Sequence, residues 1–172
     1  MKIGLALGGG GAKGYAHIPY LKALDEMGIR ISCISGTSMG AIIGAFYAGG
    51  MPGDKMAEMT EHLGIRETIK LAAPTSIKTG LTDGKNVEKY LRDNLPVQTF
   101  EELKIPLKIP ATDYWSKEEF VFEKGDLVPA IRASISLPGI FHPFRYDDKL
   151  FLDGGIVNPV PFDLLADCDF II

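Results

Sequence analysis

The chain has 172 residues, of which 46% are hydrophobic and 23% are charged, and its formal net charge is −4. This composition is typical of one folded domain with a sizeable core, and it excludes a disordered chain. The weakly acidic balance and the lack of any run of lysine or arginine argue against nucleic-acid binding. No stretch of about 18 apolar residues occurs, so no segment is expected to span a membrane.

The cysteines and the N-terminus bear on the compartment. Cys33 and Cys168 each lie in an apolar run that is typical of a strand, and we expect both to be buried free thiols of a reducing compartment. Residues 1–12 resemble a signal peptide only faintly, because the apolar run is a few residues long and a lysine follows. We therefore expect a cytoplasmic protein.

The N-terminal part alternates between predicted strands and helices. Residues 2–7 form a short apolar run that a glycine turn ends, which is typical of a buried parallel strand. Residues 12–28 have apolar side chains near helical spacing and end at a glycine. A second strand over 30–35 leads through a turn into a helix over 41–50 that is apolar on nearly all sides and must be buried. This order predicts an α/β domain with a right-handed parallel crossover.

The elements after residue 50 are less regular, and no repeat or linker divides the chain, so 1–172 is predicted to be a single domain. Amphipathic helices are predicted over 53–64 and 83–95, with a partly apolar connection over 69–81 between them. The later predictions are strands over 107–115 and 118–125 with a turn at 116–117, a helix from 128 that breaks at 138–139, a strand, glycine turn and short helix over 149–165, and a buried strand over 168–172.

The stretch "GTSMG", residues 36–40, matches the G-x-S-x-G pattern between a predicted strand and a predicted helix. A serine on such a sharp turn is exposed at the end of a sheet, and Gly36 and Gly40 relieve the crowding of the bend. Ser38 also lies at a helix N-terminus, which favours negative charge. A serine that merely caps the helix would give the same local pattern, but the strand–turn–helix context favours a nucleophile.

A serine nucleophile needs a base, and the residues offer two kinds. None of the three histidines, His17, His62 and His142, has the aspartate-then-histidine order after the serine that an α/β-hydrolase shows. Asp153 in "LFLDGG" is the better candidate, because it follows an apolar strand and precedes two glycines. An ordinary turn aspartate before glycines would fit the local pattern equally well.

The glycines of "GGGAKG", residues 9–14, also follow a strand and precede a helix. They satisfy the dinucleotide fingerprint, but the second strand ends in the serine turn and lacks the ribose-binding acid. The phosphate-binding loop pattern also fails, because a glycine follows the lysine. We therefore interpret Gly9, Gly10 and Gly11 as amide donors for the oxyanion of a tetrahedral intermediate, with Lys13 adding positive charge nearby.

These three motifs, in this order and context, resemble the patatin-like phospholipases, and the flanking stretches "SGTSMGAIIGAFYA" and "RASISLPGIFHPF" resemble bacterial members. The resemblance implies a three-layer α/β/α sandwich with a mostly parallel central sheet, and hydrolysis of lipid acyl esters. No cluster of metal-ligating residues occurs in the sequence, so we expect no metal or cofactor. The resemblance also implies Ser38 as nucleophile, Asp153 as its base without a histidine, and the glycines as oxyanion donors. Supporting positions are Lys13, Gly14, Gly36, Gly40, Gly154 and Gly155.

The sequence departs from the family pattern at three places. Lys13 stands where arginine is more common, and Pro19 stands where glycine is usual, so the first helix is expected to kink or start late. Bacterial members usually continue for about another hundred residues, so we expect either a truncated chain or a minimal one whose last strand is covered by a second copy.

Two further expectations concern partners. We expect the apolar connection over 69–81 to rim the pocket and touch a membrane surface transiently, although a packed loop would fit its pattern equally well. Two other functions remain open, namely a non-catalytic lipid-binding or regulatory protein and a nucleotide-binding module built on residues 9–14.

Overall fold

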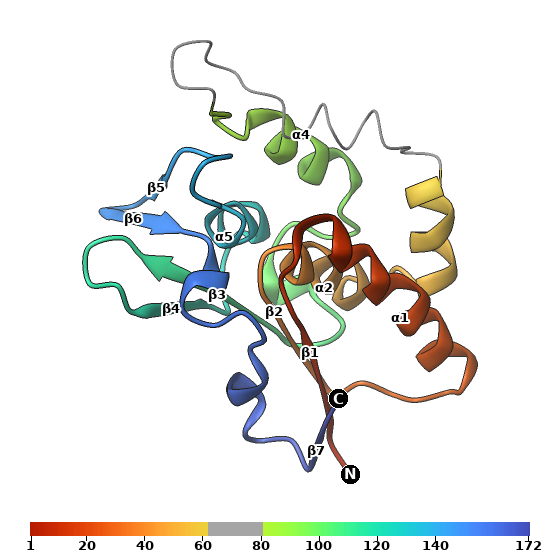
Figure 1. Ribbon diagram of the computed structural model, residues 1–172. Helices are drawn as coiled ribbons and strands as arrows, with labels where there is room; N and C mark the ends of the chain where they lie inside the picture. The colour runs from red at the N-terminus through yellow and green to blue at the C-terminus, as the bar shows by residue number, and fades with distance from the viewer. Residues whose placement is uncertain (62–80) are drawn as a thin grey trace.

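The computed structural model describes residues 1–61 and 81–172. Within them, seven strands form one sheet in the order β5-β6-β3-β2-β1-β7, and β4 pairs with β3 off this path (Figure 1). The strands are β1 (Ile3–Leu7), β2 (Cys33–Gly36), β3 (Leu107–Asp113), β4 (Glu119–Phe122), β5 (Phe144–Tyr146), β6 (Lys149–Leu152) and β7 (Phe170–Ile171).

Helices occur between most of these strands. The α-helices are α1 (His17–Glu26), α2 (Met39–Ala48), α4 (Lys85–Asn94) and α5 (Leu127–Ser134), and residues 53–61 are also helical. The 3-10 helices are η1 (Gly11–Ala16), η2 (Phe100–Glu102), η3 (Gly154–Ile156) and η4 (Phe162–Leu165).

One end of the sheet is parallel and the other is antiparallel. Strands β7, β1, β2 and β3 run parallel, with Leu5 opposite Ile34 and Ile34 opposite Leu107. Strands β4 and β6 each pair antiparallel with β3, and β5 pairs antiparallel with β6. The predicted α/β class and the parallel pairing of the first two strands are therefore confirmed.

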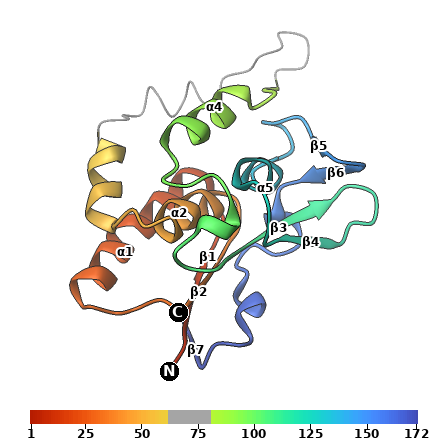
Figure 2. The same cartoon turned by 180° about the vertical axis from the view of Figure 1, so that it is seen from behind.

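The sheet separates two layers of unequal thickness (Figures 1 and 2). On one face α2 packs closely, because Gly44 in its middle lies against the apolar side chains of β1, β2 and β3. The opposite face is covered by the segment that carries η4. There the Ser35 hydroxyl donates to the carbonyl oxygen of Pro161 at 2.7 Å, and the Lys108 ammonium donates to that of Leu164 at 3.0 Å.

The first helix starts late, as its proline predicted. Residues 11–16 form η1, and the α-helix begins only at His17. Pro19 is then the third helical residue, where no amide donor to the helix is required. The predicted helix over 53–64 is helical to residue 61, and residues 62–80 of the chain, with most of the predicted apolar connection, lie outside the described residues.

Two predictions for the edge of the sheet are wrong. Cys33 and Cys168 are not free thiols but form a disulfide, because Gly4 lies beneath Cys168 and leaves room for the two sulfur atoms to meet. The last strand is not buried: β7 pairs only with β1 in the described residues, and Phe170 is 59% exposed.

A further strand, β5, was not predicted.

Candidate active site

Ser38 lies on the sharp turn between β2 and α2. Its backbone has φ 55° and ψ −117°, an unusual conformation for a residue other than glycine. A Cβ atom at Gly36 would overlap the backbone of Gly40, and one at Gly40 would overlap the carbonyl oxygen of Leu7. The turn therefore requires glycine at both positions, as its sequence pattern predicted.

The Ser38 side chain does not cap the helix that it precedes. It makes no capping hydrogen bond, although Ser38 occupies the N-cap position of α2. Its hydroxyl instead donates to Oδ2 of Asp153 at 2.8 Å, across 115 positions of the chain. The local pattern left these two uses of the hydroxyl open, and the contact with the carboxylate is the one observed.

Asp153 follows β6, which pairs antiparallel with β3, the strand that lies between β6 and β2 in the sheet. Its Oδ1 accepts a hydrogen bond from the amide of Gly155 at 2.7 Å, the contact of an ordinary turn aspartate, while Oδ2 faces Ser38. The backbone is held on both sides, because the Asp153 amide donates to the carbonyl oxygen of Ser136 at 3.0 Å and the Thr112 hydroxyl donates to that of Asp153 at 2.8 Å.

Asp153 is only 4% exposed. This burial raises its pKa above the ordinary value, and the hydrogen bonds from Ser38 and Gly155 oppose the rise. Within the described residues, no lysine, arginine or histidine forms an ion pair with it. The carboxylate is therefore a better proton acceptor than one in water.

The glycine loop after β1 lies against the Ser38 turn. A Cβ at Gly9 would lie 3.4 Å from that of Ser38. The Gly9 amide is already engaged, since it donates to the carbonyl oxygen of Pro159 at 2.9 Å. In the described part of the chain, no acceptor is paired with the amide of Gly10 or of Gly11, so these two are the donors that a ligand could use.

The neighbouring positions have different surroundings. Gly14 is buried against the side chain of Met39, whereas Lys13 is exposed. The ring of His17 donates from Nε2 to the carbonyl oxygen of Gly8 at 2.9 Å and so supports the glycine loop. None of the hydrogen bonds that join Ser38 and Asp153 to the rest of the described residues involves a histidine.

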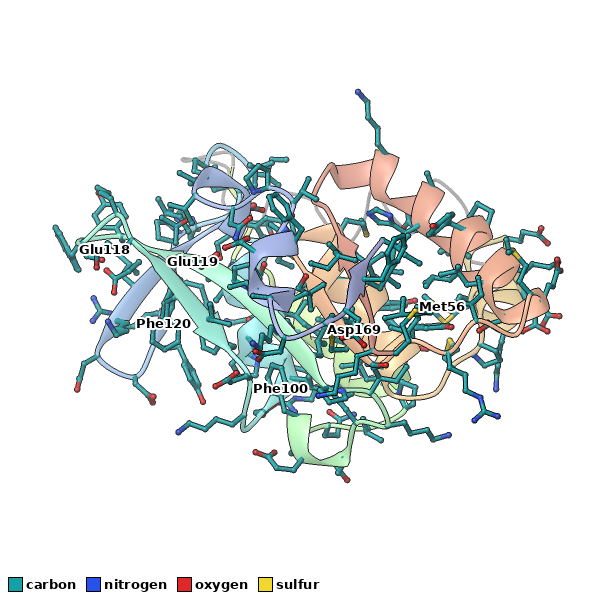
Figure 3. All side chains as sticks on the ribbon, turned by 90° about the horizontal axis from the view of Figure 1, so that it is seen from below. Met56, Phe100, Glu118, Glu119, Phe120 and Asp169 are labelled. Carbon is teal, nitrogen blue, oxygen red and sulfur yellow. A yellow bond between two sulfur atoms is a disulfide. The ribbon has the colours of Figure 1, made fainter. Side chains whose placement is uncertain are left out.

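A cavity of about 290 Å³ opens beside Ser38. Its walls come from η1, α1, α2, the helix over 53–61, α4 and the segment that follows α5. Figure 3 shows one wall residue, Met56, among the N-terminal helices. Glu119 and Phe120 of β4 lie on the other side of the view, so the cavity is on the helical side of the molecule. The apolar side chains of the walls are Ala12, Ile18, Met39, Ile42, Ile43, Phe46, Met56, Met59, Val87, Leu91, Ile135, Leu137, Ile140 and Phe141.

The sequence interpretation missed the residues that support the pair. The Ser134 hydroxyl oxygen, at the end of α5, accepts the Ser38 amide at 3.0 Å, and Ser136 accepts the Asp153 amide. Both serines are fully buried. The stretch "RASIS", residues 132–136, carried a signal, because an arginine and two serines beside apolar residues need polar partners once they are buried.

Neither a metal site nor a membrane-spanning helix is found within residues 1–61 and 81–172. No group of histidine, cysteine, aspartate or glutamate side chains is placed to hold a metal ion. No helix in this part of the chain is long and apolar enough to cross a membrane.

Comparisons with known proteins identify the family of this chain. The family model described as "Patatin-like phospholipase" matches residues 5–166. An uncharacterised NTE family protein of Mycobacterium tuberculosis is 38% identical over 165 residues, which are 96% of this chain and 46% of that protein. The neuropathy target esterase of Drosophila melanogaster is 33% identical over 95% of this chain and 12% of its own length. The chain thus spans less than half of these curated relatives.

Solved structures share the fold. VipD from Legionella pneumophila superposes with a TM-score of 0.60 over 91% of this chain and 46% of its own, at 17% identity. The type III effector ExoU superposes with a TM-score of 0.53 over 81% of this chain and 41% of its own, also at 17% identity.

Proposed function

Because the chain belongs to the patatin-like phospholipase family, we propose that it is a serine acyl-hydrolase that cleaves the acyl esters of lipids. The observation that carries the proposal is the 2.8 Å hydrogen bond from the Ser38 hydroxyl to the buried Asp153 carboxylate, at the wall of an apolar cavity. A serine with a buried base suits covalent catalysis, and an apolar cavity beside it suits an alkyl chain.

In the first half of the proposed reaction, Ser38 Oγ attacks the carbonyl carbon of the ester while its proton passes to Asp153 Oδ2. The carbonyl oxygen becomes an oxyanion, and the amides of Gly10 and Gly11 are the donors we assign to it. Each such donor contributes about 3–4 kcal/mol to the stability of the transition state in other enzymes. The intermediate then collapses, the ester C–O bond breaks, and the leaving alkoxide takes the proton from Asp153.

In the second half, water attacks the carbonyl carbon of the acyl–Ser38 ester. Asp153 accepts a proton from the water and returns it to Ser38 Oγ when the acyl–serine bond breaks. The products are a carboxylic acid and the free enzyme. The raised pKa of Asp153 suits this role, because a base with greater proton affinity takes the serine proton more readily.

The acyl chain is expected to occupy the cavity beside Ser38. Each methylene buried there contributes about 0.8 kcal/mol to binding, so longer chains should be favoured until the cavity is full. Replacing Ile42 in its wall with tryptophan should lower activity on long-chain esters while sparing short-chain ones.

A fluorophosphonate probe tests the proposal. We expect it to label the wild-type chain at Ser38, and Ser38→Ala to lose labelling and about 10⁴-fold or more of the hydrolysis of a short-chain ester. Ser116→Ala, at the exposed β3–β4 turn, is the matched control and should behave as the wild type. Ser38→Ala activity within about tenfold of the parent would contradict the assignment. A wild-type chain that binds vesicles but neither reacts nor hydrolyses would instead support a non-catalytic lipid-binding protein.

A further inference from the structure

Arg132 is a cationic side chain inside the core, on the last turn of α5. It is 1% exposed, and its guanidinium lies 4.7 Å from the ring centre of Phe141 and 5.2 Å from that of Phe144. Burial disfavours a charged group and lowers the pKa of this guanidinium. A buried guanidinium needs hydrogen-bond acceptors or an opposite charge, and these partners show which segments Arg132 connects.

The guanidinium joins the residues that follow α5 to Asp83, which is 49 positions away in the segment before α4. Nη1 donates to the hydroxyl oxygen of Ser136 at 2.9 Å, and Nη2 donates to the carbonyl oxygen of Asp83 at 3.0 Å. Nη2 also lies 3.4 Å from the carbonyl oxygen of His142. The planar fork of arginine suits this arrangement, because one side chain reaches several acceptors in fixed directions.

The segment before α4 is shaped to receive this side chain. Gly84 has φ 78°, and a Cβ atom there would overlap the guanidinium of Arg132. Nε has no hydrogen-bond partner, but it lies 3.6 Å from Oε1 of Glu88 on the first turns of α4. The carboxylate of Glu88 carries the opposite charge and is partly exposed to solvent.

Two hydrogen bonds, both made by Ser136, connect the guanidinium to Asp153 of the candidate active site. Ser136, which holds Arg132 through its hydroxyl, accepts the amide of Asp153 through its carbonyl oxygen at 3.0 Å. Two positions earlier, Ser134 accepts the Ser38 amide at 3.0 Å. The same short turn therefore fixes the backbone of both members of the Ser38–Asp153 pair.

We propose that Arg132 is a positioning residue, which acts through Ser136 to hold Asp153 at hydrogen-bonding distance from Ser38. This inference rests on the proposed function. Arg132 touches neither Ser38 nor Asp153, so it takes no part in proton transfer. Its effect is to fix the turn that follows α5 against the segment before α4, and so to fix the distance across which the Ser38 proton moves.

The first test is a steady-state comparison on a soluble short-chain ester. Arg132→Met keeps an unbranched apolar stem, although a shorter one, and removes the charge and the fork. A displacement of about 1 Å at the reacting atoms can cost about 100-fold in rate, so kcat should fall by that order while KM stays within about threefold. Arg132→Lys, which keeps the charge and one donor, should recover part of the loss. Arg92→Met, at an exposed arginine of α4 that pairs with Asp126, should leave both constants unchanged.

A double-mutant cycle separates positioning from general stability. If Arg132 acts through Ser136, then Arg132→Met added to Ser136→Ala should lower kcat by much less than it does alone. Losses in kcat that multiply fully would overturn the inference. The cycle also includes Arg132→Lys with Ser136→Ala, which keeps the test valid if Arg132→Met does not fold.

Amide hydrogen exchange supplies a readout that does not depend on activity. In Arg132→Lys and Ser136→Ala, the Asp153 amide should exchange faster by about tenfold or more, whereas the Leu5 amide in β1 should keep its rate. If the wild-type chain proves inactive, the proposed function fails and exchange alone decides the inference. An unchanged Asp153 amide in both variants would overturn it.

Discussion

Replacing Asp153 with asparagine should abolish activity without weakening the fold. The amide keeps the size of the carboxyl group and its acceptor for the Gly155 amide, but it cannot take the Ser38 proton at neutral pH. Loss of a base that acts as a unit with its nucleophile costs about 10⁴-fold or more in kcat, which corresponds to about 5.5 kcal/mol.

The effect on stability follows from the burial of the carboxylate. Removing an ion of this kind from water costs several kcal/mol, and two hydrogen bonds to a charged acceptor return about 1.5–3 kcal/mol each. The desolvation cost and the hydrogen-bond gain of the carboxylate nearly cancel. The neutral amide of asparagine has a smaller desolvation cost and weaker hydrogen bonds. We therefore expect Asp153→Asn to be as stable as the wild type or more stable by up to about 2 kcal/mol, or roughly 4–8 °C in Tm.

The pH dependence has a definite sign. Because burial raises the folded-state pKa of Asp153 above its unfolded value, the folded chain binds more protons between the two values. Wild-type stability relative to Asp153→Asn should therefore fall as pH rises through that window and remain lower above it. Wild-type kcat should show the opposite trend, rising with pH as the carboxyl group ionises.

Ester hydrolysis and thermal unfolding, measured for both proteins across a pH series, check these expectations. His17→Gln serves as the comparison, because His17 supports the glycine loop and does not touch the Ser38–Asp153 pair. An active Asp153→Asn together with an inactive but folded His17→Gln would refute the reasoning and replace the pair with a histidine-based site. A stability advantage of Asp153→Asn that shrinks as pH rises would refute the burial argument.

Two further substitutions test the turn that carries the nucleophile. Ser134→Ala should cost about 1–3 kcal/mol of unfolding free energy, because the Ser38 amide loses its acceptor inside the core, and denaturant unfolding together with the rate of fluorophosphonate labelling measures the result. Gly40→Ala should cost at least about 3 kcal/mol or prevent folding, since its Cβ would overlap the carbonyl oxygen of Leu7. Gly44→Ala in the same helix is the control, and it should be milder because its Cβ would meet only side-chain atoms, the nearest at 3.3 Å.

Local sequence patterns predicted the structure correctly where residues a few positions apart determine the backbone conformation. The sharp turn at Ser38 could be predicted because only glycine fits two positions before and two after it. The late start of α1 could be predicted because a proline ring excludes the amide hydrogen bonds of a continuous helix. In the same way, "LFLDGG" identified Asp153 at the end of a strand, with its Oδ1 on the amide of Gly155.

The sheet edge shows where such patterns fail. An apolar run does not reveal whether neighbouring strands will cover it, so the half-exposed β7 looked like a buried strand. Cys33 and Cys168 are 135 positions apart, and their pairing depends on the glycine of β1 that lies between the two strands. No local signal could have indicated that contact.

The sequence by itself determined the elements and the motifs, because these depend on residues a few positions apart. The tertiary structure decided which motif residues meet and what each polar atom does. It brought Asp153 to Ser38 through the pairing of β6 with β3, and it engaged the amide of Gly9 elsewhere. It also connected the buried Arg132 to the backbone of Asp153 through Ser136. The physical reason is that hydrogen-bond partners far apart in the chain are set by strand register and helix packing, which depend on the whole fold.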